Sequence, residues 1–326
     1  MTPFQILNAE PDRYSPEAES ILKLAGEVQA KPLTRLQLLE CLPEFDALIV
    51  RLGFQVDREM IDRGGRLKAI VTATTGLDHI DVAYAREKGI QVLSLRGEYE
   101  FLRSIPATAE HTWGLLLALI RNIPSAFQSV LRGEWERDRF RGRDLAGRRL
   151  GILGLGRIGE KIARYGMAFS MEVCAFDPYR QAWIAGVQKM DSQADLLRVS
   201  QVFTIHVPLN DQTRLLVGKD ELALLPEGAV LINTARGEVL DEPALLEALE
   251  TGRLAGAALD VIWNERSPEQ AQSKLIDYAS RHANLIVTPH IGGATLESMA
   301  MTEVFMARKL AAYLGSLAHE TGGEAA

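Results

Sequence analysis

Short apolar runs alternate with amphipathic stretches through the first hundred residues of the chain. Four of these runs have the length and composition of buried strands, at residues 4–7, 47–50, 68–72 and 90–93. Segments such as 17–27 and 81–88 lie between them and space their apolar residues as helices do. Strands that alternate with helices predict a parallel sheet covered by helices.

A second series of the same kind begins near residue 150. We expect its strands at 150–153, 172–176, 202–206, 229–233, 255–260 and 285–288, and its helices at 158–169, 219–225 and 242–251. Residues 110–131 precede it as one long helical segment, broken or kinked near Pro124 because proline cannot donate a backbone hydrogen bond. The last helix is expected at 297–314, and its Ala, Met and Leu residues favour a return to the first domain.

Composition narrows the class of protein. A chain of 326 residues is long enough for two domains. A net charge of -7 favours a small-molecule partner over nucleic acid or a membrane surface, since either of those usually requires a basic patch. Cys41 and Cys174 have no CxxC spacing, so we expect reduced, structural cysteines and no metal site. With no signal peptide and no apolar run long enough to span a bilayer, the expected location is cytoplasmic.

The stretch "GILGLGRIG" follows a predicted strand and opens a predicted helix. Gly154, Gly156 and Gly159 have the spacing that a dinucleotide site requires for a tight turn, a close approach to pyrophosphate and close helix packing. Glycines also occur in such turns for steric reasons alone, but Asp177 ends the next predicted strand, where a carboxylate binds the adenosine ribose. Asp177 would repel a 2′-phosphate and so favours NAD over NADP, while the nearby Arg180 opposes that preference.

Three further groups follow predicted strands of the second series. Arg236 in "NTARGEVLDEPAL" offers a guanidinium fork for a carboxylate and an adjacent carbonyl oxygen. His290 in "TPHIGGAT" is a candidate acid/base, and Glu265 in "ALDVIWNE" would raise its pKa and fix its tautomer. An isolated arginine is often a surface residue and an isolated histidine is often structural, as we expect for His79, His111 and His206. Three such residues on successive loops of one sheet favour a catalytic site.

These four groups together resemble the D-2-hydroxyacid dehydrogenase family. The similarity extends through "TGLDHIDVAYAREKGI", "ATAEHTWGLLLAL" and "GEWERDRFRGRDLAGRRLGILGLGRIG", and covers most of the chain. It implies an α/β fold of two doubly wound parallel-sheet domains. A Rossmann nucleotide-binding domain, residues 105–294, would be inserted into a flavodoxin-like substrate domain formed by 1–104 and 295–326. The family also implies a homodimer built through the nucleotide domain and segment 109–140.

The resemblance further implies a role for individual residues. Arg236 would bind the carboxylate and carbonyl oxygen of a 2-oxo acid, His290 would be the general acid/base, and Glu265 would support it. Hydride would move between NAD and C2 of the substrate. The implied cofactor contacts are Gly154, Gly156, Arg157, Ile158, Gly159, Asp177, His206, Val207, Pro208, Thr234, Ala235, Asp260, Gly292 and Gly293. The implied substrate contacts are Arg51, Thr74, Thr75, Gly76 and Arg236.

Departures from the family pattern leave the substrate open. Many members have Glu-Pro where this chain has Glu265-Arg266, which suggests a displaced loop. The turn before Gly76 lacks the arginine typical of phosphoglycerate members, although "GEWERDRF" resembles that branch and Arg51, Arg96 and Arg103 offer other basic groups. Residues 95–111 form a longer connection than usual, either a specificity loop or a surface insertion. The first hypothesis is a 3-phosphoglycerate-like substrate, and the alternatives are an NAD(H)-sensing corepressor-like protein or a dehydrogenase of a non-carboxylate substrate such as phosphite.

Overall fold

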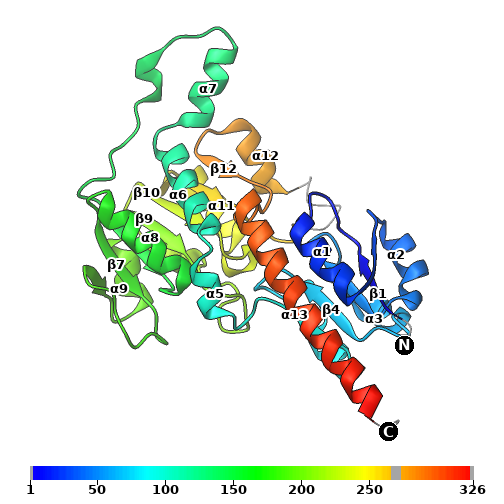
Figure 1. Ribbon diagram of the computed structural model, residues 1–326. Helices are drawn as coiled ribbons and strands as arrows, with labels where there is room; N and C mark the ends of the chain where they lie inside the picture. The colour runs from blue at the N-terminus through cyan, green and yellow to red at the C-terminus, as the bar shows by residue number, and fades with distance from the viewer. Residues whose placement is uncertain (1–2, 266–272, 324–326) are drawn as a thin grey trace. The chain divides into compact units, whose positions relative to one another are not determined.

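The computed structural model describes residues 3–265 and 273–323 (Figure 1). The chain forms two compact units. Unit 1 contains Met1–Leu102 together with Ala294–Ala326, and unit 2 contains Arg103–Gly293. Unit 2 is therefore inserted into unit 1 along the chain.

Unit 1 is built on a five-stranded parallel sheet in the order β2-β1-β3-β4-β5. Its strands are β1 (Phe4–Asn8), β2 (Gly26–Ala30), β3 (Ala47–Val50), β4 (Ala69–Thr72) and β5 (Gln91–Leu93). Every residue of β3 and β4 is buried, as expected for a sheet covered by helices on both faces. The strand order is that of flavodoxin-like folds, in which the order reverses at β1 and β3.

The helices of unit 1 begin at residues whose side chains accept hydrogen bonds from the first turn, a common cap. They are α1 (Pro16–Ala25), α2 (Arg35–Cys41), α3 (Arg58–Arg63) and α4 (Val82–Glu87), capped by Ser15, Thr34, Asp57 and Asp81. A short 3-10 turn, η1 (Leu42–Glu44), follows α2. The last helix, α13 (Leu296–Gly323), packs along α1 and against β4 and β5, as expected for a helix that returns to this unit.

Two predicted features of unit 1 take a different form in the structure. Residues 17–27 were expected to be one helix, but α1 ends at Ala25 and Gly26 begins β2. A Cβ at Gly26 would lie 2.3 Å from the carbonyl oxygen of Phe4, so glycine permits the close pairing of β2 with β1. The 95–111 connection contains α5 (Tyr99–Arg103), and the ring of Phe101 stacks on Phe305 of α13 with centroids 4.1 Å apart.

Unit 2 is built on a seven-stranded parallel sheet in the order β12-β11-β10-β9-β6-β7-β8. The strands are β6 (Arg149–Leu153), β7 (Glu172–Phe176), β8 (Val187–Lys189), β9 (Val202–Ile205), β10 (Ala229–Asn233), β11 (Leu254–Leu259) and β12 (Leu285–Val287). The order reverses beside β6, the strand that precedes the glycine-rich turn, and doubly wound sheets bind ligands at such a point. The two predicted doubly wound parallel sheets are confirmed.

Helices cover both faces of this sheet (Figure 1). The helices of unit 2 are α6 (Ala107–Ile120), α7 (Ile123–Leu131), α8 (Arg157–Ala168), α9 (Gln193–Val199), α10 (Lys219–Leu224), α11 (Glu242–Glu250) and α12 (Lys274–Arg281), with 3-10 turns η2 (Arg137–Phe140) and η3 (Gly237–Val239). Alternate residues of β6 divide between two cores: Ile152 packs in a core with α6 and α8, while Leu153 packs in a core with α9, α10 and α11. This alternation lets one strand contribute to the cores on both faces of the sheet.

The helical segment predicted at 110–131 begins earlier and is broken before Pro124. α6 ends at Ile120, and Asn122 has a left-handed backbone with φ of 54°. Pro124 lies in the first turn of α7, where its missing N–H breaks no helical hydrogen bond. Strand β8 was not predicted, because it is only three residues long and two of them are exposed.

Among the described residues, no single helix has both the length and the apolar composition needed to cross a membrane. The segment Tyr99–Ile120 and α7 meet that test only as a pair bent by 63°.

Candidate active site

The turn between β6 and α8 has the geometry that a bound pyrophosphate requires. Gly154 has φ of 90°, and a Cβ there would lie 2.7 Å from the carbonyl oxygen of His206. A Cβ at Gly159 would lie 2.3 Å from the carbonyl oxygen of Gly154, so helix and strand approach closely. At Gly156 the same position faces open space, and this N-terminal cap residue offers no side chain to the first N–H groups of α8. A helix start of this kind binds an anionic phosphate group, so the turn fits a dinucleotide.

Asp177 lies at the end of β7 and faces this turn. Its Oδ2 accepts a hydrogen bond from the backbone N–H of Leu155 at 2.9 Å, and its Oδ1 accepts one from Tyr179 at 3.0 Å. The two predicted pyrophosphate neighbours Arg157 and Ile158 form the first turn of α8. The structure therefore brings the predicted ribose and pyrophosphate contacts to one edge of the sheet.

His206 and Val207 border the same turn from the end of β9. The Nε2 atom of His206 lies 2.9 Å from Oγ1 of Thr204, while its Nδ1 atom is buried without a partner among the described residues. Desolvation of this partly buried ring lowers the pKa of His206 to about 3, which keeps the ring neutral near pH 7. Pro208 follows, and its carbonyl oxygen accepts a hydrogen bond from Thr213 at 2.6 Å.

Asp260, at the end of β11, organises the loop that carries His290. Its Oδ1 accepts hydrogen bonds from Thr288 at 2.6 Å and from the backbone N–H of Ile291 at 2.9 Å, and its Oδ2 accepts one from Gly292 at 2.7 Å. Burial alone would raise the pKa of Asp260, but these donors, together with His111 at 3.1 Å, hold it below its ordinary value. An ionised Asp260 thus anchors residues 288–292.

Glu265 and His290 form a close pair. The Oε1 atom of Glu265 lies 2.6 Å from Nδ1 of His290, and each side chain is only 22% exposed. Glu265 thus reaches the histidine without a following proline. His290 has a left-handed backbone with φ of 54°, and its N–H donates to the carbonyl oxygen of Asp260 at 2.9 Å. Arg266 lies outside the described residues.

Arg236 follows β10, the strand next to β11. The side chain of Asn233, the last residue of β10, holds the turn that leads to Arg236. Its Nδ2 donates to the carbonyl oxygen of Arg236 at 2.9 Å, and its Oδ1 accepts from the backbone N–H of Ala235 at 3.0 Å. Thr234 lies 2.7 Å from Thr112 of α6 through their hydroxyl oxygens. Arg236, Glu265 and His290 therefore follow three adjacent parallel strands, β10, β11 and β12, at the same edge of the sheet.

Contacts that the sequence did not predict join the Arg236 loop to the Glu265 loop. A Cβ at Gly237 would lie 2.3 Å from the carbonyl carbon of Ile262, so the backbones of the two loops lie too close together for any residue but glycine at this position. Trp263 donates through Nε1 to the carbonyl oxygen of Leu240 at 2.8 Å, and its backbone N–H donates to Glu242. The only sequence signal for this connection was a large aromatic residue two positions before Glu265.

The predicted substrate residues of unit 1 lie on two loops. Thr74, Thr75 and Gly76 form the turn after β4, where Oγ1 of Thr74 donates to the carbonyl oxygen of Gly76 at 2.7 Å. Arg51 follows β3, but its guanidinium contacts the buried Glu303 at 2.5 Å and the carbonyl oxygen of Asp12 at 2.8 Å. The sequence did not show that Arg51 has these internal partners.

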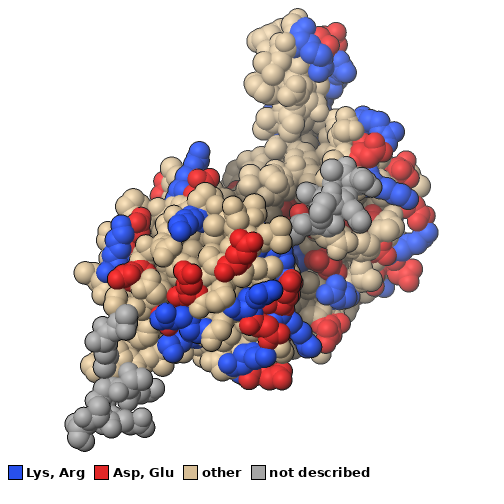
Figure 2. Space-filling view, turned by 90° about the vertical axis from the view of Figure 1, so that its right-hand side faces the viewer, with Lys and Arg blue, Asp and Glu red and all other residues tan. Residues whose placement is uncertain are grey.

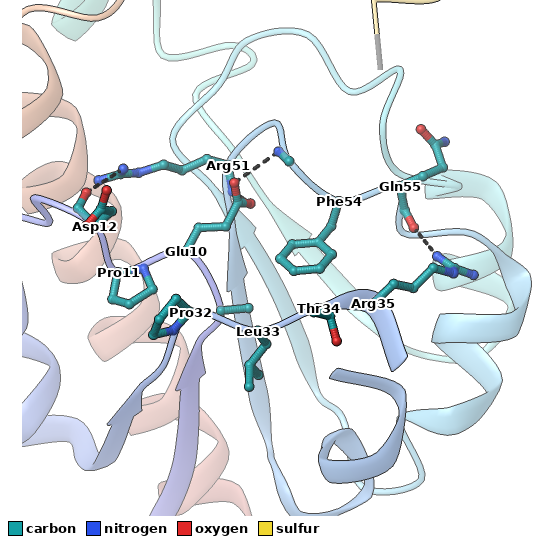
Figure 3. A pocket seen from close by; sticks show the side chains of 12 residues that line it. Glu10, Pro11, Asp12, Pro32, Leu33, Thr34, Arg35, Arg51, Phe54 and Gln55 are labelled. Atoms are coloured by element: carbon teal, nitrogen blue, oxygen red, sulfur yellow. Dashed lines mark hydrogen bonds between the residues drawn. The ribbon is translucent and has the colours of Figure 1, made fainter. Parts of the chain in front are cut away.

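Arg51 also lines a pocket of about 570 Å³ at the ends of β1, β2 and β3 (Figure 3). Figure 3 shows its side chain extending toward Asp12. Glu10 in the pocket accepts backbone hydrogen bonds from Arg51 at 2.5 Å and Gly53 at 3.0 Å, and Arg35 pairs with Asp57 at 2.7 Å. These charged groups are occupied by internal partners, and the turn 74–76 does not line the pocket.

Comparison with known proteins identifies the family. Residues 113–292 match the family described as D-isomer specific 2-hydroxyacid dehydrogenase, NAD binding domain. The chain is 39% identical over 303 residues to a D-3-phosphoglycerate dehydrogenase of Methanocaldococcus jannaschii, covering 92% of this chain and 56% of that protein. It is 36% identical over 306 residues to a hydroxypyruvate reductase of Thermotoga maritima, covering 93% of this chain and 97% of that protein.

Solved structures give the same assignment. A D-lactate dehydrogenase from Aquifex aeolicus, complexed with NAD and lactic acid, is 27% identical with a TM-score of 0.83, and the match covers 98% of each chain. This chain belongs to the D-isomer specific 2-hydroxyacid dehydrogenase family, and its predicted NAD-binding domain, inserted into a substrate domain, is confirmed. It spans about half the length of the phosphoglycerate dehydrogenases that it matches.

Proposed function

We propose that this protein is an NAD-dependent dehydrogenase that interconverts a small or phosphorylated 2-hydroxy acid and the corresponding 2-oxo acid. The observation that carries the proposal is the 2.6 Å contact between Glu265 and His290, at the same sheet edge as the glycine-rich turn. A carboxylate bonded to one nitrogen of a histidine fixes the tautomer and the orientation of the ring. The other nitrogen, Nε2, is then available to exchange a proton with substrate.

NAD supplies the hydride acceptor in the oxidation and, when reduced, the hydride donor in the reverse direction. In the oxidation, His290 takes the proton of the C2 hydroxyl group as the hydride leaves C2, and in the reduction it returns that proton to the carbonyl oxygen. Glu265 balances the charge that the imidazole gains. The chain holds these two residues on loops fixed by Asp260 and Trp263, so little reorganisation accompanies proton transfer.

We assign binding of the substrate carboxylate and carbonyl oxygen to Arg236, whose guanidinium fork matches two oxygen acceptors. The turn of Thr74, Thr75 and Gly76 in unit 1 is proposed as the second substrate contact. We also retain the proposed cofactor contacts from the glycine-rich turn, Asp177, and the loops after β9, β10 and β12. On this assignment, residues of unit 2 carry both the cofactor and the proton transfer.

The substrate is proposed to be 3-phosphoglycerate or a close analogue such as glycerate. Support comes from the similarity to a phosphoglycerate dehydrogenase and to a hydroxypyruvate reductase. Arg51 is the proposed phosphate or carboxylate contact of unit 1, and binding there requires a ligand that competes with Glu303 for the guanidinium. A phosphorylated acid carries more negative charge than pyruvate and so competes better for the guanidinium.

We also propose that the active form is a homodimer joined through the nucleotide-binding unit 2 and segment 109–140. The part of this segment at residues 123–135 is called the α7 region. The described apolar side chains that are unusually exposed there are Ile123, Phe127, Val130, Leu131 and Trp135. In Figure 2 uncharged side chains dominate the surface of this region, and charged ones gather at its tip. A cluster of this kind is typical of a surface that is covered in an assembly.

The function is tested by following NADH oxidation by the purified protein with 3-phosphohydroxypyruvate, hydroxypyruvate, glyoxylate and pyruvate, with NADPH in parallel. We expect turnover with NADH and a preference for one of the first two acids, because they carry the C3 oxygen group that pyruvate lacks. Tight NADH binding without turnover of any acid would contradict the proposal and favour an NAD(H)-sensing protein.

A further inference from the structure

Arg180 lies three residues after Asp177, in the loop that follows β7. In dinucleotide-binding folds a carboxylate at the end of this strand binds the ribose of NAD, and a nearby arginine accommodates the 2′-phosphate of NADP. This chain contains both residue types within four positions. Which cofactor it prefers therefore depends on where the guanidinium of Arg180 is held.

The donors of Arg180 are directed to partners inside unit 2. Its Nη2 atom lies 2.6 Å from Oε1 of Glu160, and its Nε atom donates to the carbonyl oxygen of Ala182 at 2.5 Å. Its Nη1 atom donates to the carbonyl oxygen of Leu155, within the glycine-rich turn itself. The side chain is only 18% exposed. The guanidinium is thus folded against the turn by three separate acceptors.

Glu160 is the charged member of these acceptors. It lies in the first turn of α8, directly after Gly159, where the positive end of the helix dipole favours a carboxylate. Its side chain is 27% exposed, so its pairing with Arg180 is less screened than a fully exposed ion pair. Arg164, one turn further along α8, approaches the other carboxylate oxygen at 3.6 Å and is 60% exposed.

We infer that Glu160 is a specificity-determining residue for the cofactor, because it pairs with Arg180 and so neutralises the charge that would otherwise attract a 2′-phosphate. On the proposed assignment, Asp177 binds the ribose hydroxyl groups of NAD. Glu160 adds the second element of discrimination, since without it the arginine already present would attract the phosphate of NADP. The preference for NAD thus depends on an ion pair as well as on a ribose-binding carboxylate.

The inference rests on the proposed dinucleotide binding by unit 2, but not on the identity of the acid substrate. It is tested by measuring the Kd of NADH and of NADPH, through the fluorescence of the reduced nicotinamide, for the wild type and Glu160→Gln. We expect the ratio of the NADPH Kd to the NADH Kd to fall about five- to tenfold in Glu160→Gln, the effect of one newly available charged contact. An unchanged ratio would overturn the inference.

Two further comparisons assign the effect to Arg180. In an Arg180→Ala background, Glu160→Gln should leave the ratio unchanged, because the released guanidinium is absent. In an Arg164→Ala background, Glu160→Gln should still lower the ratio, because Arg164 is not the responsible group. A fall in the ratio of the NADPH Kd to the NADH Kd that persists without Arg180 would contradict the inference. Thermal unfolding of each variant establishes that it is folded.

These outcomes are separate from those of the proposed function. A shifted cofactor ratio in a protein that turns over no 2-oxo acid would support the role of Glu160 and contradict the dehydrogenase reaction. Turnover of a 2-oxo acid by the wild type, with an unchanged cofactor ratio in Glu160→Gln, would support the dehydrogenase reaction and contradict the role of Glu160. Failure of the wild type to bind either dinucleotide would contradict both.

Discussion

At the scale of single residues, the candidate site depends on side-chain contacts, some of which the sequence predicted and others of which it did not. Glu265 and His290 are 25 residues apart, yet their pairing was expected because each follows a strand of one parallel sheet. The donors to Asp260 were not expected, because the residues that reach a carboxylate depend on loop conformation. Likewise, the sequence places Arg51 after a strand, but its contact with Glu303, 252 residues away, depends on how α13 packs.

His206 makes the stability of the protein depend on pH. Its folded pKa of about 3 lies below the ordinary value of 6.5, so the unfolded chain binds this proton first as the pH falls. The contribution of neutral His206 is therefore complete above pH 6.5 and is lost progressively between pH 6.5 and 3. One such group changes the free energy of unfolding by about 1.4 kcal/mol per pH unit within that window.

We predict that His206→Gln has a smaller decrease in the free energy of unfolding between pH 7 and pH 5 than the wild type. Urea unfolding at each pH measures this difference, whatever the absolute stability of the variant. His319→Gln, at an exposed position of α13, is the matched control and should retain the slope of the wild type. Equal slopes for wild type and His206→Gln would contradict the buried, neutral state of this histidine.

At the scale of the elements, strongly apolar central strands were predictable, whereas the edge strands β2 and β8 were not. β3, β4, β9 and β10 consist entirely of buried residues, so each appears as an apolar run. β2 and β8 are edge strands with polar residues on their exposed sides, and their patterns resemble loops or helix ends. The break near Pro124 was predicted, but the left-handed conformation of Asn122, where it occurs, is not indicated by the hydrophobic pattern.

The α7 region is the element on which the proposed homodimer depends. Phe127 is 58% exposed, so Phe127→Glu should not disturb a core but should place a charge in the proposed interface. We predict that light scattering gives a dimeric mass for the wild type and a monomeric mass for Phe127→Glu at micromolar concentration. Leu24→Glu, at a 91% exposed position of α1 in unit 1, should remain dimeric. A monomeric wild type or a dimeric Phe127→Glu would exclude this interface.

For the whole molecule, the pattern of strands and helices predicted two parallel α/β series, and the resemblance to the family implied the insertion of one unit into the other. Parallel sheets place the carboxyl ends of their strands at one edge, so motifs far apart in sequence converge. The sequence pattern does not predict the hydrogen bonds that fix the loops at this edge, such as those made by Trp263 and Asn233. It also leaves the acid substrate open, because side chains of both units are proposed to contact it.

The most direct test of the central claim is the rate of NADH oxidation by His290→Ala, measured with the 2-oxo acid that the wild type prefers. If His290 is the acid/base, turnover should fall by roughly 10²–10⁴-fold, while the Kd of NADH stays close to that of the wild type, since the glycine-rich turn is intact. Full turnover in a folded His290→Ala variant would contradict the proposed role of the Glu265–His290 pair.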